Sequence, residues 1–177
     1  MKEQHKKQLE EWTGLKCSEI LFDSYIDDWS SKTSVFDKRI IGKKQLIFLI
    51  EDEDGEIFGY YLNTEIVEKY LTYQETDYKS FQFNLQSKNN LLVGPMKFEI
   101  KNSKYGGIYL YDKSDCNLIN LGNINLMKEN NKHQSCCKQD EYNFDYHGIK
   151  NALCGKLDHR YGLMFFTPKR ILVIQMK

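Results

Sequence analysis

The chain has 177 residues, of which 41% are hydrophobic and 14% aromatic, a composition that predicts one folded domain rather than a disordered segment. Its 25 basic and 25 acidic residues cancel to a net charge of zero, which argues against a nucleic-acid-binding or membrane-surface protein, since both usually carry a basic excess. The charged N-terminus lacks the apolar centre of a signal peptide and no apolar run could span a bilayer, so we expect a cytoplasmic protein without membrane insertion.

Residues 2–12 are charged and helix-forming, and Gly14 is a suitable stop for a helix. Leu9 and Trp12 are its only large apolar side chains. Because two residues make a thin apolar stripe, we expect this helix to dock by its end or to fray. We treat residues 1–14 as a helical N-terminal segment and residues 15–177 as a single domain.

A hairpin over residues 45–62 is the strongest structural signal in the chain. Residues 46–50 are apolar without alternation, which is typical of a strand covered on both faces. An acidic turn follows, in which Gly55 can adopt the positive φ that a tight turn needs. In the second strand, Gly59 allows another group to approach closely. We expect this hairpin at the centre of a β-rich domain.

Around the hairpin the patterns predict short strands and few helices. Residues 15–22 predict a strand, and two short helices are expected, one at 33–41 capped by Ser31 or Thr33, and one at 63–70 capped by Asn63. Strict alternation in residues 80–86 and 96–101 predicts strands with one wet and one buried face. Further strands are expected at 108–111, 118–121, 163–166 and 170–176, the last two joined by a turn at 167–169, and residues 123–139 are expected to form a surface loop. This arrangement predicts a mainly β fold, a β-sandwich with helices at its edge.

The five cysteines are scattered and predict free thiols. His133, Cys136, Cys137 and His147 have some of the composition of a metal site, but adjacent cysteines do not chelate one ion well, so we predict no metal. Cys136 and Cys137 remain candidate redox thiols if one is exposed and has a depressed pKa.

The chain contains no recognisable catalytic motif, and we predict neither catalytic residues nor a cofactor. Two weaker signals leave alternatives open. The carboxylates of Asp23, Asp27, Asp28 and Asp37 could include an acid–base pair of an unknown enzyme, although loop and cap roles are commoner. The basic residues between Lys38 and Lys44 could contact nucleic acid in a transcription-linked regulator, or form a solvated surface.

The order of these pieces resembles the TLDc family, most closely the divergent members found in amoebae. The resemblance covers about residues 15–176. Its motif residues include Ser24, Trp29, Ser30 and Phe36, the Phe58–Gly59 step after the acidic turn, and the Gly106–Gly107 pair before a later strand. The chain departs from the family at Tyr60, where the motif has a second glycine.

This resemblance implies a sandwich of two antiparallel sheets flanked by short helices. It also implies a non-catalytic protein-interaction domain, because members of the family have no established active site. Relatives protect cells against oxidative stress, and several bind and regulate the vacuolar proton pump. The cytosolic sector of that pump is therefore the leading expected partner, which would recruit the chain to endomembranes. Alternatives are a thiol-based oxidative-stress effector and a vesicle-traffic adaptor.

Overall fold

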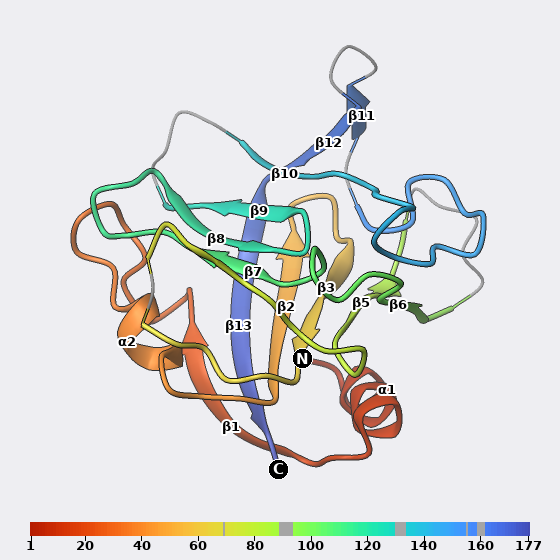
Figure 1. Ribbon diagram of the computed structural model, residues 1–177, viewed down its shortest axis with the longest axis horizontal. Helices are drawn as coiled ribbons and strands as arrows, with labels where there is room; N and C mark the ends of the chain where they lie inside the picture. Colours follow the sequence, from red (N-terminus) through yellow and green to blue (C-terminus); the bar gives the residue numbers. More distant parts are fainter. Residues whose placement is uncertain (69, 89–93, 130–133, 155, 159–161) are drawn as a thin grey trace.

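The computed structural model describes residues 1–68, 70–88, 94–129, 134–154, 156–158 and 162–177. These residues form two antiparallel β-sheets that pack against each other, with two short helices at the periphery (Figure 1). The mainly β, two-sheet sandwich expected from the sequence is confirmed. Of the two helices in the described ranges, neither is long and apolar enough to cross a membrane.

The first sheet has six strands among the described residues. Their spatial order is β1 (Cys17–Asp23), β13 (Pro168–Met176), β2 (Leu46–Asp52), β3 (Ile57–Leu62), β5 (Phe81–Gln86) and β6 (Met96–Glu99). The predicted hairpin is the β2–β3 pair at the centre of this sheet, in register from Leu46↔Leu62 to Glu51↔Ile57. The C-terminal strand lies between β1 and β2, so it is central, as its apolar sequence predicts.

The second sheet has seven strands in the described part of the chain. Their order is β11 (Lys156–Asp158), β12 (Leu163–Phe166), β10 (Ser135–Cys137), β9 (Ile124–Met127), β8 (Asn117–Leu121), β7 (Ile108–Leu110) and β4 (Tyr73–Gln74). The helices are α1 (Glu3–Thr13) and α2 (Phe36–Ile40).

Strand β2 contributes to two separate apolar clusters. Leu46, Phe48 and Ile50 belong to the core between the sheets, whereas Ile47 and Leu49 belong to a second cluster on the outer face of the first sheet. All five side chains are buried. The absence of alternation in the sequence therefore has a direct cause, because this strand has no solvent-facing side.

Helix α1 covers the outer cluster. Leu9 is fully buried there, and the Trp12 ring packs edge-on against Phe81, with 6.1 Å between the ring centroids. His5 is also buried, and burial lowers the pKa of its imidazole. The expectation that the helix would dock by its end or fray is wrong, because Leu9 and Trp12 both lie on the sheet surface.

The polar side chains of β5 point into the sandwich, against the prediction of a wet face. Gln82 and Asn84 are fully buried, while Phe81, Phe83 and Leu85 face outward beneath α1. The Gln82 amide donates to the Gly122 carbonyl at 2.5 Å and accepts from the Tyr146 hydroxyl at 2.6 Å. These partners compensate the loss of water around the amide.

Residues 63–68 form no helix, although the sequence predicts one over 63–70; residue 69 lies outside the described part of the chain. Local polar bonds hold this segment in an irregular path. The Gln74 amide bonds both the N–H and the carbonyl of Val67, each at 3.0 Å. The Asn63 amide donates to Asp77 at 2.6 Å instead of capping a helix. Such side-chain bonds compete with helix formation.

The expected surface loop over 123–139 is also wrong in part, because β9 and β10 lie within it. A two-residue turn at Gly122 and Asn123 joins β8 to β9, with φ values of 53° and 76°. A Gly-Asn pair between apolar runs is a hairpin signal. Residues 130–133 lie outside the described ranges.

Two further details differ from the predictions. Residues 167–169 do not form a hairpin turn, because β12 belongs to the second sheet and β13 begins at Pro168 in the first (Figure 1). Helix α2 starts after Val35 without a side-chain cap from Ser31 or Thr33. Instead the Phe36 N–H donates to the Ser34 hydroxyl at 3.2 Å.

Asp52 at the hairpin turn is buried, and one of its carboxylate oxygens accepts the Glu56 N–H at 2.8 Å. Burial, opposed in part by that hydrogen bond, raises the pKa of Asp52. A raised folded-state pKa means that the native state loses stability as the pH rises through that pKa. Asp52→Asn keeps the acceptor and removes the charge. We expect it to match or exceed the parent in melting temperature at pH 7, with the advantage shrinking towards pH 4. A parent more stable by over about 1 kcal/mol at pH 7 would contradict this.

Gly59 has no room for a side chain, since an added Cβ would lie 1.9 Å from the Phe48 carbonyl oxygen and 2.8 Å from the Phe83 ring. We expect Gly59→Ala to lower the free energy of unfolding by roughly 1–3 kcal/mol, measured by urea denaturation. Gly148→Ala is the matched control, because nothing lies within 4 Å of its added Cβ and only its φ of 73° opposes the change. The two variants should differ, with Gly59→Ala the less stable.

Candidate functional site

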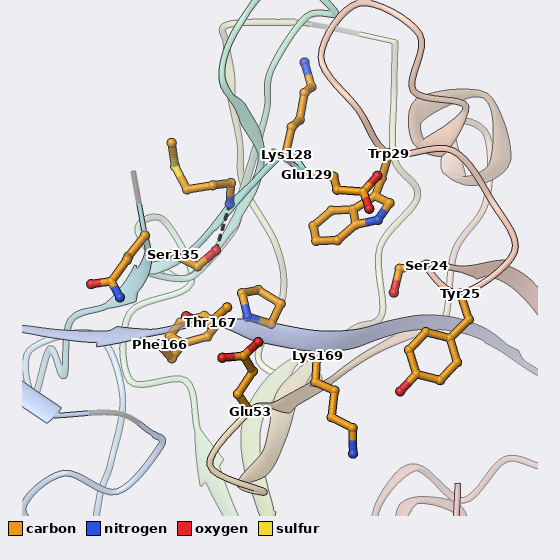
Figure 2. Close-up of a pocket in the computed structure, with 13 residues that line it drawn as sticks. Ser24, Tyr25, Trp29, Glu53, Lys128, Glu129, Ser135, Phe166, Thr167 and Lys169 are labelled. Atoms are coloured by element: carbon orange, nitrogen blue, oxygen red, sulfur yellow. Dashed lines mark hydrogen bonds between the residues drawn. The ribbon is translucent and has the colours of Figure 1, made fainter. Parts of the chain in front are cut away.

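A cavity of about 610 Å³ lies where the loop after β1 meets both sheets (Figure 2). We call it the Trp29 pocket. Four chain segments line it, from the loop after β1, the β2–β3 turn, the β9–β10 region and the β12–β13 junction: Ser24, Tyr25, Trp29, Glu53, Met127, Lys128, Glu129, Gln134, Ser135, Phe166, Thr167, Pro168 and Lys169.

One end of the loop after β1 is bound to β13. Ser24 donates its N–H to the Ile171 carbonyl at 3.0 Å, and its hydroxyl accepts the Ile171 N–H at 2.9 Å. Next to it, Arg170 donates to both oxygens of Asp23, at 3.0 and 2.5 Å. Arg170 also lies over the Tyr25 ring, 4.7 Å from its centroid. These contacts fix where the loop leaves the first sheet.

The other end of the loop is bound to the segment that follows β9 of the second sheet. The Glu129 N–H donates to the Trp29 carbonyl at 3.2 Å, and Ser30 forms a parallel bridge with Glu129. The Ser30 hydroxyl also donates to the Glu129 carboxylate at 3.2 Å. The loop therefore spans the two sheets and forms one wall of the pocket.

The two lysines that line the pocket are held by other groups, whereas the two glutamates that line it are exposed. Lys128 turns its ammonium away from the pocket (Figure 2). The ammonium donates to the carbonyls of Asp112 and Asp115, at 2.6 and 2.8 Å. Burial lowers its pKa. Lys169 pairs with Glu51 at 2.7 Å. Glu53 and Glu129 are exposed.

Two apolar side chains stand out on the loop that forms the pocket wall. Tyr25 is 57% exposed and Ile26 is 84% exposed. Ordered apolar side chains that remain in water beside a cavity are typical of surfaces that bind other molecules.

The structure brings together three of the family-motif residues, since Ser24, Trp29 and Ser30 all lie on the loop of the Trp29 pocket. Phe36 and Phe58 are core residues, the first edge-on to Phe22 and the second edge-on to Phe166, each with 5.0 Å between ring centroids.

Two of the motif glycines, Gly59 and Gly107, lie at tight backbone contacts. Besides Gly59, an added Cβ on Gly107 would lie 2.0 Å from the Gln74 carbonyl oxygen. The Gly106 carbonyl accepts the buried Tyr60 hydroxyl at 2.5 Å. These motif positions serve the fold rather than the pocket.

The two candidate redox thiols have different environments. Cys136 is half-buried, and burial raises the pKa of its thiol, the opposite of what activates a cysteine. Cys137 is fully buried, and its sulfur lies 3.2 Å from that of Cys154. Sequence reasoning missed Cys154 as a partner, because the two residues are distant in the chain and no spacing rule links them.

No group of three or more His, Cys, Asp or Glu side chains within the described ranges is arranged to hold a metal ion. Of the residues with metal-site composition, His133 lies outside the described residues. His147 is exposed and lies 3.5 Å from Asp145 and 3.7 Å from Glu99.

The four aspartates that are candidate catalytic groups each take part in hydrogen bonds within the fold, and Asp23 accepts those from Arg170 described above. Asp27 accepts the Asp23 N–H at 2.9 Å, and Asp28 accepts the Ser30 N–H at 2.8 Å. Asp37 accepts the Tyr70 hydroxyl at 2.9 Å. In the nearby segment between Lys38 and Lys44 the basic side chains are exposed, and Arg39 pairs with Asp27 at 3.2 Å.

In comparisons with known proteins, no family model matches the chain and no curated protein is significantly similar to it. The TLDc assignment therefore stays a prediction from the motif residues.

Sequence reasoning missed much of the pocket. From the sequence, Glu53 is expected only as part of a turn, Glu129 falls in an expected loop, and the β12–β13 junction is expected to be a hairpin. Pro168 could have indicated that a strand begins there, because proline is tolerated at the first residue of a strand.

The Asp23–Arg170 pair should stabilise the loop in a pH-dependent way. The hydrogen bonds from Arg170 are the main cause that lowers the pKa of Asp23. A lowered pKa contributes stability above the carboxyl's unfolded pKa, and this stability is lost as the pH falls through the folded one. We expect Arg170→Met to cost about 1–3 kcal/mol at pH 7 and less below pH 4, by denaturant unfolding. Arg39→Met, which breaks a more exposed pair, should cost at most about 1 kcal/mol. Equal costs for both would contradict this account.

Proposed function

We propose that this chain is a non-catalytic protein-interaction module of the TLDc type, and that the Trp29 pocket with the Tyr25–Ile26 rim is its binding face. The observation that carries the proposal is the placement of Ser24, Trp29 and Ser30 on one loop that spans the two sheets and walls the pocket. The fold is also the kind that the family resemblance implies, a two-sheet antiparallel sandwich with short helices.

The exposed apolar side chains of the rim favour a protein partner over a small substrate. Trp29 and Phe166 supply aromatic surface in the pocket lining. Tyr25, which also lines the pocket, and its chain neighbour Ile26 add exposed apolar surface. Aromatic residues are the side chains most often responsible for binding energy at protein interfaces. A loop fastened at both ends presents these groups with little loss of conformational entropy on binding.

The proposed partner is the cytosolic sector of the vacuolar proton pump, which the family resemblance names. Binding to that sector would place a cytoplasmic chain at endomembranes without any membrane insertion of its own. A role in protection against oxidative stress would follow from regulation of the pump, with no reaction performed by this chain.

Binding of the purified cytosolic sector to the immobilised full chain, by surface plasmon resonance, tests this proposal. We expect the double variant Tyr25→Ala, Ile26→Ala to weaken binding at least about tenfold, since it removes the exposed apolar side chains of the face. Tyr142→Ala is the matched control, because Tyr142 is 71% exposed and does not line the pocket.

The possible results separate the two parts of the proposal. No binding by the parent chain would refute the pump as partner. Binding by the parent that the double variant retains in full would refute the face. Equal loss in the Tyr142→Ala control would show that the contact is not confined to the pocket rim, which also contradicts the proposed face.

A further inference from the structure

The sulfur atoms of Cys137 and Cys154 are in direct contact in the core between the two sheets. They lie 3.2 Å apart, so either thiol can donate a hydrogen bond to the other. Cys137 is fully buried and Cys154 is 2% exposed. A disulfide has an S–S distance of about 2.05 Å, so the two sulfurs need to approach by only about 1 Å.

The backbone around this contact is held from both sides. Cys137 belongs to β10, which is paired with β9 and β12. Next to Cys154, the Leu153 carbonyl accepts the Asn84 amide at 2.6 Å, and the Ala152 N–H donates to the Gln139 side chain at 3.0 Å. The two cysteines are therefore kept together by bonds that do not involve either sulfur.

We propose that Cys137 and Cys154 are an oxidation site, and that a hydroperoxide converts them into an intramolecular disulfide. This inference is independent of the proposed binding function. It also replaces the sequence-based expectation that Cys136 and Cys137 are the redox thiols, because the sulfur within contact distance of Cys137 belongs to Cys154.

The reaction balances with hydrogen peroxide as the oxidant. One cysteine sulfur attacks an oxygen of the peroxide, so the S–O bond forms as the O–O bond breaks. The departing hydroxide takes up the thiol proton and leaves as the first water, which gives a sulfenic acid. The sulfur of the other cysteine then attacks the sulfenic sulfur, so the S–S bond forms, the S–O bond breaks and the second water leaves. The two thiols lose two electrons and two protons, and the peroxide is reduced to two waters.

The surroundings of the two thiols determine how fast they are oxidised. Burial, the contact with Cys137 and the nearby carboxylates of Asp52 and Glu56 raise the pKa of the Cys154 thiol. Because the thiolate is the nucleophile, the closed fold reacts slowly and oxidation proceeds through local opening. The bond should therefore form more slowly than peroxide oxidises an exposed thiol.

Once formed, the disulfide would join β10 to a segment that β5 of the first sheet already holds through Asn84. The two cysteines are 17 positions apart in the chain. Cross-links of this kind stabilise chiefly by restricting the unfolded chain. The oxidised protein should therefore melt roughly 5–10 °C above the reduced protein.

Differential alkylation of the full chain tests the proposal. The folded protein is exposed to hydrogen peroxide, free thiols are blocked under denaturing conditions, and disulfides are then reduced and alkylated with a second reagent. Peptide mass spectrometry should find the second reagent on Cys137 and Cys154 in equal fractions. A non-reduced digest should contain the cross-linked peptide pair, lighter than its two reduced peptides by two hydrogen atoms.

Two variants make the result specific. Cys136→Ala changes the neighbouring half-buried cysteine and should leave the cross-link intact. Cys154→Ala should leave Cys137 without the second reagent. If Cys154→Ala fails to fold, the digest of the parent protein still decides. A cross-link through Cys136, or both thiols of the pair still free after prolonged incubation with excess peroxide, would overturn the proposal.

Discussion

Both faces of β2 are covered by packed side chains, and this strand joins the layers of the molecule. Phe48 and its neighbours on one face fill the core between the sheets, while Ile47 and Leu49 on the other support α1. On either side, β13 and β3 pair with it along its length. Gly59 on β3 is the tightest point of this arrangement, since its missing side chain leaves space for the Phe48 carbonyl. The position of the Trp29 pocket depends on the same sheet, because β13 carries Arg170 and Ile171, which anchor the loop.

Local patterns in the sequence predicted the fold class and the central hairpin, because β2 and β3 are adjacent in the chain and joined by a turn with its own signal. The failures have a common origin in contacts between distant residues. Gln82 has the pattern of a wet-face residue, but its amide is satisfied by Gly122 and Tyr146 from outside its own sheet. The outward face of β5 is apolar only because α1 covers it. Neither fact is visible from alternation alone.

Only the wall formed by the loop after β1 was predictable from the sequence. Ser24, Trp29 and Ser30 were selected through the family resemblance, whereas much of the remaining lining comes from the β12–β13 junction and from Glu129. Those parts meet the loop only after the two sheets have packed. The contact between Cys137 and Cys154 likewise depends on packing between distant parts of the chain. In the sequence Cys136 is the obvious partner of Cys137, but the two side chains lie on opposite faces of β10. Strand geometry could have separated Cys136 from Cys137, but it could not have identified Cys154.

The central functional claim is that a partner binds at the end of the sandwich where the loop after β1 crosses between the sheets. Amide hydrogen exchange of the full chain, with and without the purified cytosolic sector of the vacuolar proton pump, tests this claim most directly. The account predicts that the partner slows exchange in residues 24–30 and 166–169, with no comparable change around residues 140–148. Slowed exchange confined to another surface, or no change at a partner concentration that saturates binding, would contradict it.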